Sequence, residues 1–207
     1  MKKSKYSERD ICSKLITPAI LEAGWDLQTQ IAEEKTLTDG RIIVRGKMVA
    51  RGKQKRADYV LYMKPNIPIA IIEAKDNTHS VGDGMQQALS YAEMLRVPFA
   101  FSTNGDRFLF HDKTGLSASM ETEIELDEFP SPDELQKKYE TWKGLSDQQA
   151  QIAFQGYHDT GKTPRYYQTN AVNAAVEAIA KGQDRLLLVM ATGTGKTFTA
   201  FQIIWRL

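Results

Sequence analysis

The sequence predicts an α/β protein in which a mixed β-sheet is flanked by helices and followed by the start of a second unit. Three observations predict this fold. An amphipathic segment at residues 8–23 precedes two apolar runs of strand type at 58–63 and 67–75. A helix-type segment follows at 85–95, and strands interleaved with helices are typical of α/β folds. Residues 185–207 then contain an apolar run, a glycine-rich loop and a segment without helix breakers, in this order.

The remaining elements follow in chain order. Gly24 ends the first helix, and residues 41–49 predict a hairpin about Gly46. Short strands are expected at 99–102 and 108–111 around Asn104-Gly105, a strong turn signal.

The strand and helix signals weaken after Thr114, and Pro132 then opens a helix to about Trp142. A helix, a buried strand at 185–190 and a final helix are expected after Pro164. We therefore place one domain at 1–145, a connector at 146–164 and the beginning of another domain at 165–207.

Composition indicates a globular protein of a reducing compartment. Of the 207 residues 42% are hydrophobic and 26% are charged, which is ordinary for globular domains. The single cysteine, Cys12, excludes a disulfide scaffold within the chain. The lysines of the first ten residues precede no apolar core of a signal peptide, and no run is long enough to span a membrane. We expect a cytoplasmic location and no membrane partner.

The net charge of +1 conceals two blocks of like charge. Residues 121–134 contain seven Glu and Asp residues and no basic residue. The simplest interpretation of this acidic block is a solvated face. A basic strip without an acid lies just before the strand at 58–63, which favours contact with a phosphate backbone over base reading. The basic strip consists of Arg41, Arg45, Lys47, Arg51, Lys53, Lys55 and Arg56.

Two carboxylates are predicted to meet at one end of the central hairpin. A turn between Pro65 and Asn66 would pair Asp58 with Glu73, their Cβ atoms about 5 Å apart, although Pro68 allows a shift of register. Lys75 lies two residues beyond Glu73, on the same strand face. Paired carboxylates suit Mg²⁺, which lowers the pKa of bound water, and a lysine can stabilise phosphate charge. These parts suit hydrolysis of a phosphodiester.

The assembly D-(x14)-E-A-K resembles the PD-(D/E)xK nuclease family, with Ala57 in place of the proline. The resemblance implies that Asp58 and Glu73 are metal ligands and that Lys75 is the catalytic lysine. Glu8 matches a helical glutamate found beside such sites and would be a further ligand. Gln87 and Tyr91 match the Q-x-x-x-Y element of several of these nucleases, although a half-exposed helix face would show the same spacing.

The loop after the apolar run at 185–190 predicts an ATP phosphate site. It reads M-x-x-x-x-G-K-T, with Met190 where the P-loop pattern has glycine, but a strand and a helix flank it as that site requires. GYHDTGKT at 156–163 fits the letters, yet it follows no strand and runs into Pro164, so we interpret it as an ordinary loop. The expected ATP-binding residues are Gly193, Thr194, Gly195, Lys196 and Thr197, and the loop resembles the first motif of the helicase and translocase superfamily.

The order of motifs is similar to that of the restriction (R) subunit of type I restriction–modification enzymes. RADYVLYMKPNIPIAIIEAKDN, HSVGDGMQQALSYAEML, FPSPDEL and PRYYQTNAV…MATGTGKT carry this resemblance. It implies a Mg²⁺-dependent endonuclease domain and a RecA-like motor that translocates double-stranded DNA with ATP. It also implies methyltransferase (M) and specificity (S) subunits as partners, and Gln168 as the residue that reads adenine.

Two alternatives remain open at this point. One is a helicase-linked repair or defence nuclease of the same fold. The other is a non-catalytic DNA-binding or docking module, against which the intact Asp58, Glu73 and Lys75 argue. We expect no ATP hydrolysis by residues 1–207 alone, because they contain neither the acidic motif nor the second-lobe arginines that hydrolysis needs.

Overall fold

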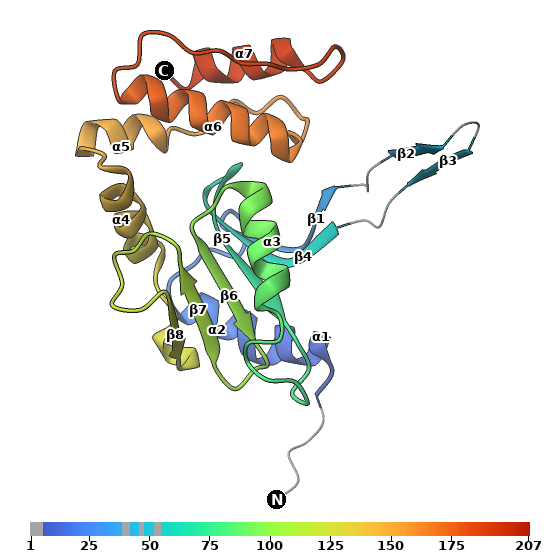
Figure 1. The fold of residues 1–207 in the computed structure, drawn as a ribbon. Helices are drawn as coiled ribbons and strands as arrows, with labels where there is room; N and C mark the ends of the chain where they lie inside the picture. The colour runs from blue at the N-terminus through green and yellow to red at the C-terminus, as the bar shows by residue number, and fades with distance from the viewer. Residues whose placement is uncertain (1–5, 39–41, 46–47, 52–54) are drawn as a thin grey trace, which may run out of the picture.

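The structure is a computed structural model that describes residues 6–38, 42–45, 48–51 and 55–207. At position 38 and in the segments 42–45 and 48–51, only the backbone is described. A six-stranded mixed sheet in the order β1-β4-β5-β6-β7-β8 forms its centre, with β5 and β6 parallel and the other neighbours antiparallel (Figure 1). Its strands are β1 (Ile31–Thr38), β4 (Lys55–Lys64), β5 (Ile67–Ala74), β6 (Phe99–Thr103), β7 (Phe108–Asp112) and β8 (Glu121–Ile124).

A continuous N-terminal helical segment covers one face of the sheet. It comprises α1 (Glu8–Ile11), a π-helical turn η1 (Cys12–Ile16) and α2 (Thr17–Glu22). Pro18 has no N–H to donate, and the preceding Thr17 N–H bonds to the Cys12 carbonyl, five residues back. The predicted helix at 8–23 is therefore confirmed, and its proline is accommodated by a wider turn rather than by a break. Gly24, with φ +95°, follows its last turn.

The face under α1 and α2 holds the larger core. Aromatic side chains of β6 and β7 meet Phe129 there, and Phe101 stacks on Phe110 with ring centroids 4.5 Å apart. The opposite face is covered by α3 (Met85–Leu95), whose small and apolar residues pack on Val60, Ile71 and Ala100. Helices on both faces confirm the predicted α/β architecture.

The C-terminal third is helical and lies beyond one end of the sheet (Figure 1). It contains α4 (Pro132–Lys143), α5 (Asp147–Ala153), α6 (Tyr166–Ala180) and α7 (Lys196–Trp205). Asn170 of α6 donates to the Met94 carbonyl of α3 at 2.8 Å, and Asn173 donates to the Asn66 carbonyl of the β4–β5 turn at 3.2 Å. These bonds attach α6 to the sheet domain.

The predicted strand at 185–190 is wrong. Residues 183–191 have no regular structure, and the side chains of Leu187 and Val189 are 88% and 86% exposed. A strand of this type is stable only between parallel neighbours that accept its hydrogen bonds and cover both its faces. No described residue pairs with this segment in a sheet.

Two strands and one α-helix were not anticipated from the sequence, nor was the short 3₁₀ turn η2 (Leu126–Glu128). β1 and β8 are polar edge strands, and each pairs with only one neighbour among the described strands. Their residues lack the apolar alternation by which half-buried strands are recognised. α5 lies within the expected connector, where Ser146 accepts a hydrogen bond from the Gln149 N–H and caps the helix.

The predicted hairpin before the central strands is confirmed in its paired part. β2 (Ile42–Arg45) and β3 (Met48–Arg51) are antiparallel, with Ile42 opposite Arg51 and Arg45 opposite Met48. They form a separate two-stranded sheet that projects from the ends of β1 and β4 (Figure 1). The residues about which the hairpin was expected to turn, 46 and 47, lie outside the described residues.

Candidate active site

The register of the central hairpin brings the two predicted carboxylates together. Tyr59 pairs with Ile72 and Val60 with Ile71, so the predicted register is confirmed at this end. The shift expected from Pro68 occurs nearer the turn and leaves the carboxylate end in register. The Asp58 N–H donates to Glu73 Oε1 at 3.3 Å, and the Ala74 N–H donates to Asp58 Oδ2 at 2.8 Å. Asp58 and Glu73 therefore face one another across β4 and β5.

Glu73 is an unusual carboxylate because it is fully buried and incompletely bonded. Its side chain has no exposed surface, and its Oε2 atom has no hydrogen-bond partner among the described residues. Burial and the neighbouring charge of Asp58 raise the pKa of Glu73 to about 8, against the smaller opposing effect of Lys75. A buried carboxylate with a free oxygen carries a desolvation cost that a bound cation would relieve.

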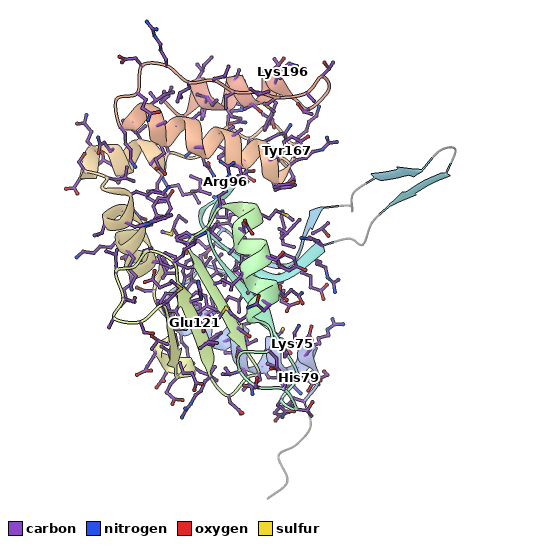
Figure 2. All side chains as sticks on the ribbon, in the orientation of Figure 1. Lys75, His79, Arg96, Glu121, Tyr167 and Lys196 are labelled. Carbon is purple, nitrogen blue, oxygen red and sulfur yellow. The ribbon has the colours of Figure 1, made fainter. Side chains whose placement is uncertain are left out.

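Lys75 and Glu8 lie at the same end of the molecule. The Lys75 N–H continues the pairing of β5 with β6 by donating to the Thr103 carbonyl at 2.8 Å. Figure 2 shows Lys75 and His79 close together beside α1, which carries Glu8. Desolvation and the charge of Asp58 raise the pKa of Glu8, whereas the charge of Lys75 lowers it. Glu8 is thus within electrostatic reach of the pair, although the described residues contain no group of three or more His, Cys, Asp or Glu that could hold a metal ion.

Gln87 and Tyr91 are brought together one turn apart on α3. Gln87 Nε2 donates to the Tyr91 hydroxyl at 3.2 Å, and Tyr91 is buried. Burial and then the charge of Glu73 raise the pKa of Tyr91. The charges of Glu73 and Asp58 both act on the Tyr91 hydroxyl in this direction, so Tyr91 lies within electrostatic reach of the carboxylates. The part that either residue plays in catalysis stays a prediction.

Only the end of the basic strip can be placed. Arg41, Lys47 and Lys53 lie outside the described residues, and only the backbone of Arg45 and Arg51 is described. Lys55 lies over the Tyr91 ring, with Nζ 6.0 Å from the ring centroid, which joins the strip to the α3 side of the site. Arg56 pairs with Glu34 at 3.3 Å, and both side chains are exposed.

The acidic block at 121–134 is partly neutralised by its neighbours. Glu123 and Glu125 bind Arg107 at 3.5 and 2.9 Å, and Glu121 lies 3.0 Å from His111. These pairs fit the interpretation of the block as a solvated face.

The phosphate loop lies at the end of the molecule opposite to Lys75, as the position of Lys196 in Figure 2 shows. Gly193 and Gly195 have φ of +77° and +88°, which a side chain would disfavour. Gly195 is the N-cap of α7, so N–H groups of the first turn of α7 are free to bind an anion. Lys196 Nζ lies 3.4 Å from the Met190 and Ala191 carbonyls of the same loop.

Gln168 connects the start of α6 to the phosphate loop. Its Oε1 accepts the Arg165 N–H at 2.9 Å, and its Nε2 donates to the Thr194 carbonyl at 2.8 Å. Both ends of the amide are therefore in use within the protein, and adenine reading by Gln168 stays a prediction. The other sequence match, residues 156–163, has no helix or strand, as expected.

The fold and the site together are those expected of an α/β domain of nuclease type, joined to the first elements of a nucleotide-binding unit. Comparison with known families agrees with this class. A family described as "Type I restriction enzyme R protein N terminus" matches residues 42–117, which include Asp58, Glu73 and Lys75. A second family, "Type III restriction enzyme, res subunit", matches residues 161–207 around the phosphate loop.

Individual relatives lead to the same family. The type I restriction enzyme EcoAI endonuclease subunit of Escherichia coli is 56% identical over 207 residues, covering 99% of this chain and 26% of the relative. The EcoKI endonuclease subunit of Escherichia coli strain K12 is 29% identical, covering 75% of this chain and 17% of the relative. A solved fragment attributed to an HsdR subunit of a type I restriction enzyme from Vibrio vulnificus YJ016 has a TM-score of 0.86 and 44% identity. The match covers 99% of this chain and 38% of that fragment.

The chain belongs to the R-subunit family of type I restriction enzymes. It spans about a quarter of the length of one curated relative and less of the other. No helix of the described residues combines the length and apolar character needed to cross a membrane.

Proposed function

We propose that Asp58, Glu73 and Lys75 form the site of a Mg²⁺-dependent endonuclease that cuts double-stranded DNA. The observation that carries this proposal is the pair of carboxylates at one end of the β4–β5 hairpin, with the buried Glu73 Oε2 left without a partner among the described residues. A structural ion pair would instead leave each buried charge satisfied. The nuclease family resemblance and the name of the 56% identical relative support the same chemistry.

The residues fit a divalent cation of the Mg²⁺ type. Such ions take a small number of carboxylate oxygens and keep several waters, so two facing carboxylates suffice as protein ligands. Asp58 and the free oxygen of Glu73 would supply them, and Glu8, whose pKa responds to the charges of Asp58 and Lys75, would act on the ion or on its water. A bound cation would lower the pKa of a water molecule and offset the negative charge that grows on the phosphate.

The other residues of the site would act on the DNA itself. The Lys75 ammonium would stabilise charge on the phosphate under attack, or orient the attacking water. The Tyr91 hydroxyl, which accepts a hydrogen bond from Gln87 and is within electrostatic reach of Glu73, would help to place the phosphate. The basic strip would hold the flanking backbone without reading bases.

ATP would serve the complete protein at the other end of the molecule. Gly193, Thr194, Gly195, Lys196 and Thr197 would bind its phosphates, with Lys196 exchanging the loop carbonyls for phosphate oxygens. DNA translocation driven by this ATP would precede cleavage, in an assembly with M and S subunits, as the family resemblance implies. ATP turnover by residues 1–207, lost in Lys196→Ala, would contradict our expectation that they are inert alone.

Substitution of the site residues in the complete protein, assembled with its partner subunits, tests the proposal. Asp58→Ala, Glu73→Ala or Lys75→Ala should abolish DNA cleavage, because each removes a ligand or the phosphate-stabilising charge, while ATP hydrolysis continues. Lys113→Ala, on the turn after β7, is the matched control and should cut normally. Normal cutting by Asp58→Ala would refute the assignment and favour the DNA-docking alternative.

A further inference from the structure

The first turn of α3 lies unusually close to Glu73. Gly84 is the N-cap of α3, and its N–H donates to the Ser102 hydroxyl at 3.0 Å. Ser102 is opposite Glu73 in the parallel pairing of β5 and β6, and both side chains are fully buried. The three residues therefore form one cluster on the face of the sheet that carries the site.

Space, and not backbone conformation, requires glycine at position 84. Its φ of −85° and ψ of −12° are open to any residue. A Cβ at this position would lie 2.8 Å from Ser102 Oγ, 3.2 Å from Glu73 Cβ and 3.4 Å from the Glu73 carbonyl oxygen. The first distance is too short for any real Cβ, so Ser102 would have to turn away or α3 would have to move outwards.

The same helix face carries the other residues of the site. Gln87 and Tyr91 follow Gly84 by one and two turns, and Ala88 on this face is fully buried against the sheet. Gly84 thus sets how closely the Gln87–Tyr91 pair approaches Glu73. The hydroxyl of Ser102 keeps this turn in place, because it binds an N–H that helices leave free at their start.

We infer that Gly84 and Ser102 are positioning residues that hold Glu73 in register with Asp58 and with the Gln87–Tyr91 pair. This inference rests on the proposed nuclease function and adds two residues to it. Gly84 and Ser102 act by fixing the buried carboxylate, and supporting groups of this kind strongly affect metal sites.

Binding of Mn²⁺ to the 207-residue chain, measured by calorimetry, tests the inference without any cleavage assay. Gly84→Ala should weaken binding roughly tenfold, because the added Cβ displaces Ser102 or α3 and so disturbs the support of a metal ligand. Gly82→Ala is the matched control, since its Cβ would meet only the end of the Leu109 side chain, at 3.3 Å, and binding should be unchanged. Asp58→Ala should abolish binding.

Ser102→Ala provides a second variant that adds no atoms. It should weaken Mn²⁺ binding less than Gly84→Ala, and the double variant should be no worse than Gly84→Ala alone, because both changes disrupt the same cluster. In the complete assembled protein, both variants should cleave DNA more slowly but keep their DNA affinity and ATP hydrolysis. General destabilisation would lower all three.

The outcomes separate the inference from the proposed function. If Asp58→Ala loses Mn²⁺ but both Gly84→Ala and Ser102→Ala bind it like the parent chain, the inference is wrong and the nuclease site stands. If Asp58→Ala itself binds Mn²⁺ normally, the proposed site fails.

Discussion

Two apolar runs of the chain differ in structure and in burial. Residues 67–74 form β5, between β4 and β6, where every side chain except that of Pro68 is buried. Residues 186–189 are equally apolar, yet they form no strand and are exposed. The difference lies in their neighbours: β5 has a hydrogen-bonding strand on each side, whereas no described strand adjoins the second run. Apolar sequence alone does not make a strand, because the backbone must also be satisfied.

Truncation of one apolar side chain in each region should give the largest difference in the free energy of unfolding. Phe101→Ala removes a fully buried ring that packs on three other phenylalanines and should lower the free energy of unfolding by about 3–5 kcal/mol. Leu187→Ala, at a side chain 88% exposed, should change it by no more than about 0.5 kcal/mol. Urea denaturation measures both, and a large decrease in Leu187→Ala would show that the second run is buried in solution.

Attachment of the C-terminal helices depends on a buried charge. Arg206 is 1% exposed and donates to the Ala153 and Gln155 carbonyls at 2.6 Å each and to Asn173 Oδ1 at 2.5 Å. Arg206→Ala should destabilise this region by about 2–4 kcal/mol, because the acceptors lose a charged partner. Hydrogen exchange should quicken in α6 and α7 but not in β5. Lys181→Ala, at an exposed lysine, should have little effect. Faster exchange in β5 as well would mean that the two regions unfold together.

A buried glutamate, Glu73, and a half-buried one, Glu177, give the two regions opposite responses to pH. Burial and Asp58 raise the pKa of Glu73 from 4.5 to about 8, so the stability it contributes is lost as pH rises between these values. Burial acts to raise the pKa of Glu177 on α6 too, but the Tyr139 hydroxyl, Lys143 and Lys181 outweigh it and lower that pKa below 4.5. The stability from Glu177 is therefore lost as pH falls through its lowered pKa.

Denaturation midpoints across pH, measured without divalent cations, check this contrast. Glu73→Gln should remove the decrease in stability that accompanies a rise in pH from 4.5 to about 8, and Glu177→Gln should remove part of the decrease on the acid side. An unchanged slope over this pH range in Glu73→Gln would show that the pKa of Glu73 is not raised in the folded chain.

Neutralising the basic strip should have the smallest and most uniform effect. Replacing Arg41, Lys47 and Lys53 by alanine should weaken DNA binding equally for all sequences, since bonds to phosphate carry no base information. The dependence of log K on log salt should flatten by about 0.9 for each phosphate that is no longer neutralised. Lys137→Ala on α4 is the control. A changed preference among DNA sequences would contradict a backbone role.

The sequence alone determines those elements in which the local pattern and the available hydrogen bonds agree. The helix at 85–95 and the register that places Asp58 opposite Glu73 follow from apolar spacing and from the turn at Pro65-Asn66. Asp58, Glu73 and Lys75 could be named in advance because their spacing along one hairpin places them at the same end of it. Family resemblance supplied their proposed roles.

Tertiary structure decided what depends on neighbours distant in sequence. Residues 185–190 do not form the expected strand because no described strand pairs with them. The polar β1 and β8 are strands because β4 and β7 present backbone N–H and C=O groups with which they pair. The unsatisfied burial of Glu73, and the lack of space for any side chain at Gly84, arise only when α3 is packed on β5 and β6. The sequence specifies which chemical groups a segment carries. Whether those groups are buried or crowded depends on other segments that pack against them only in the folded protein.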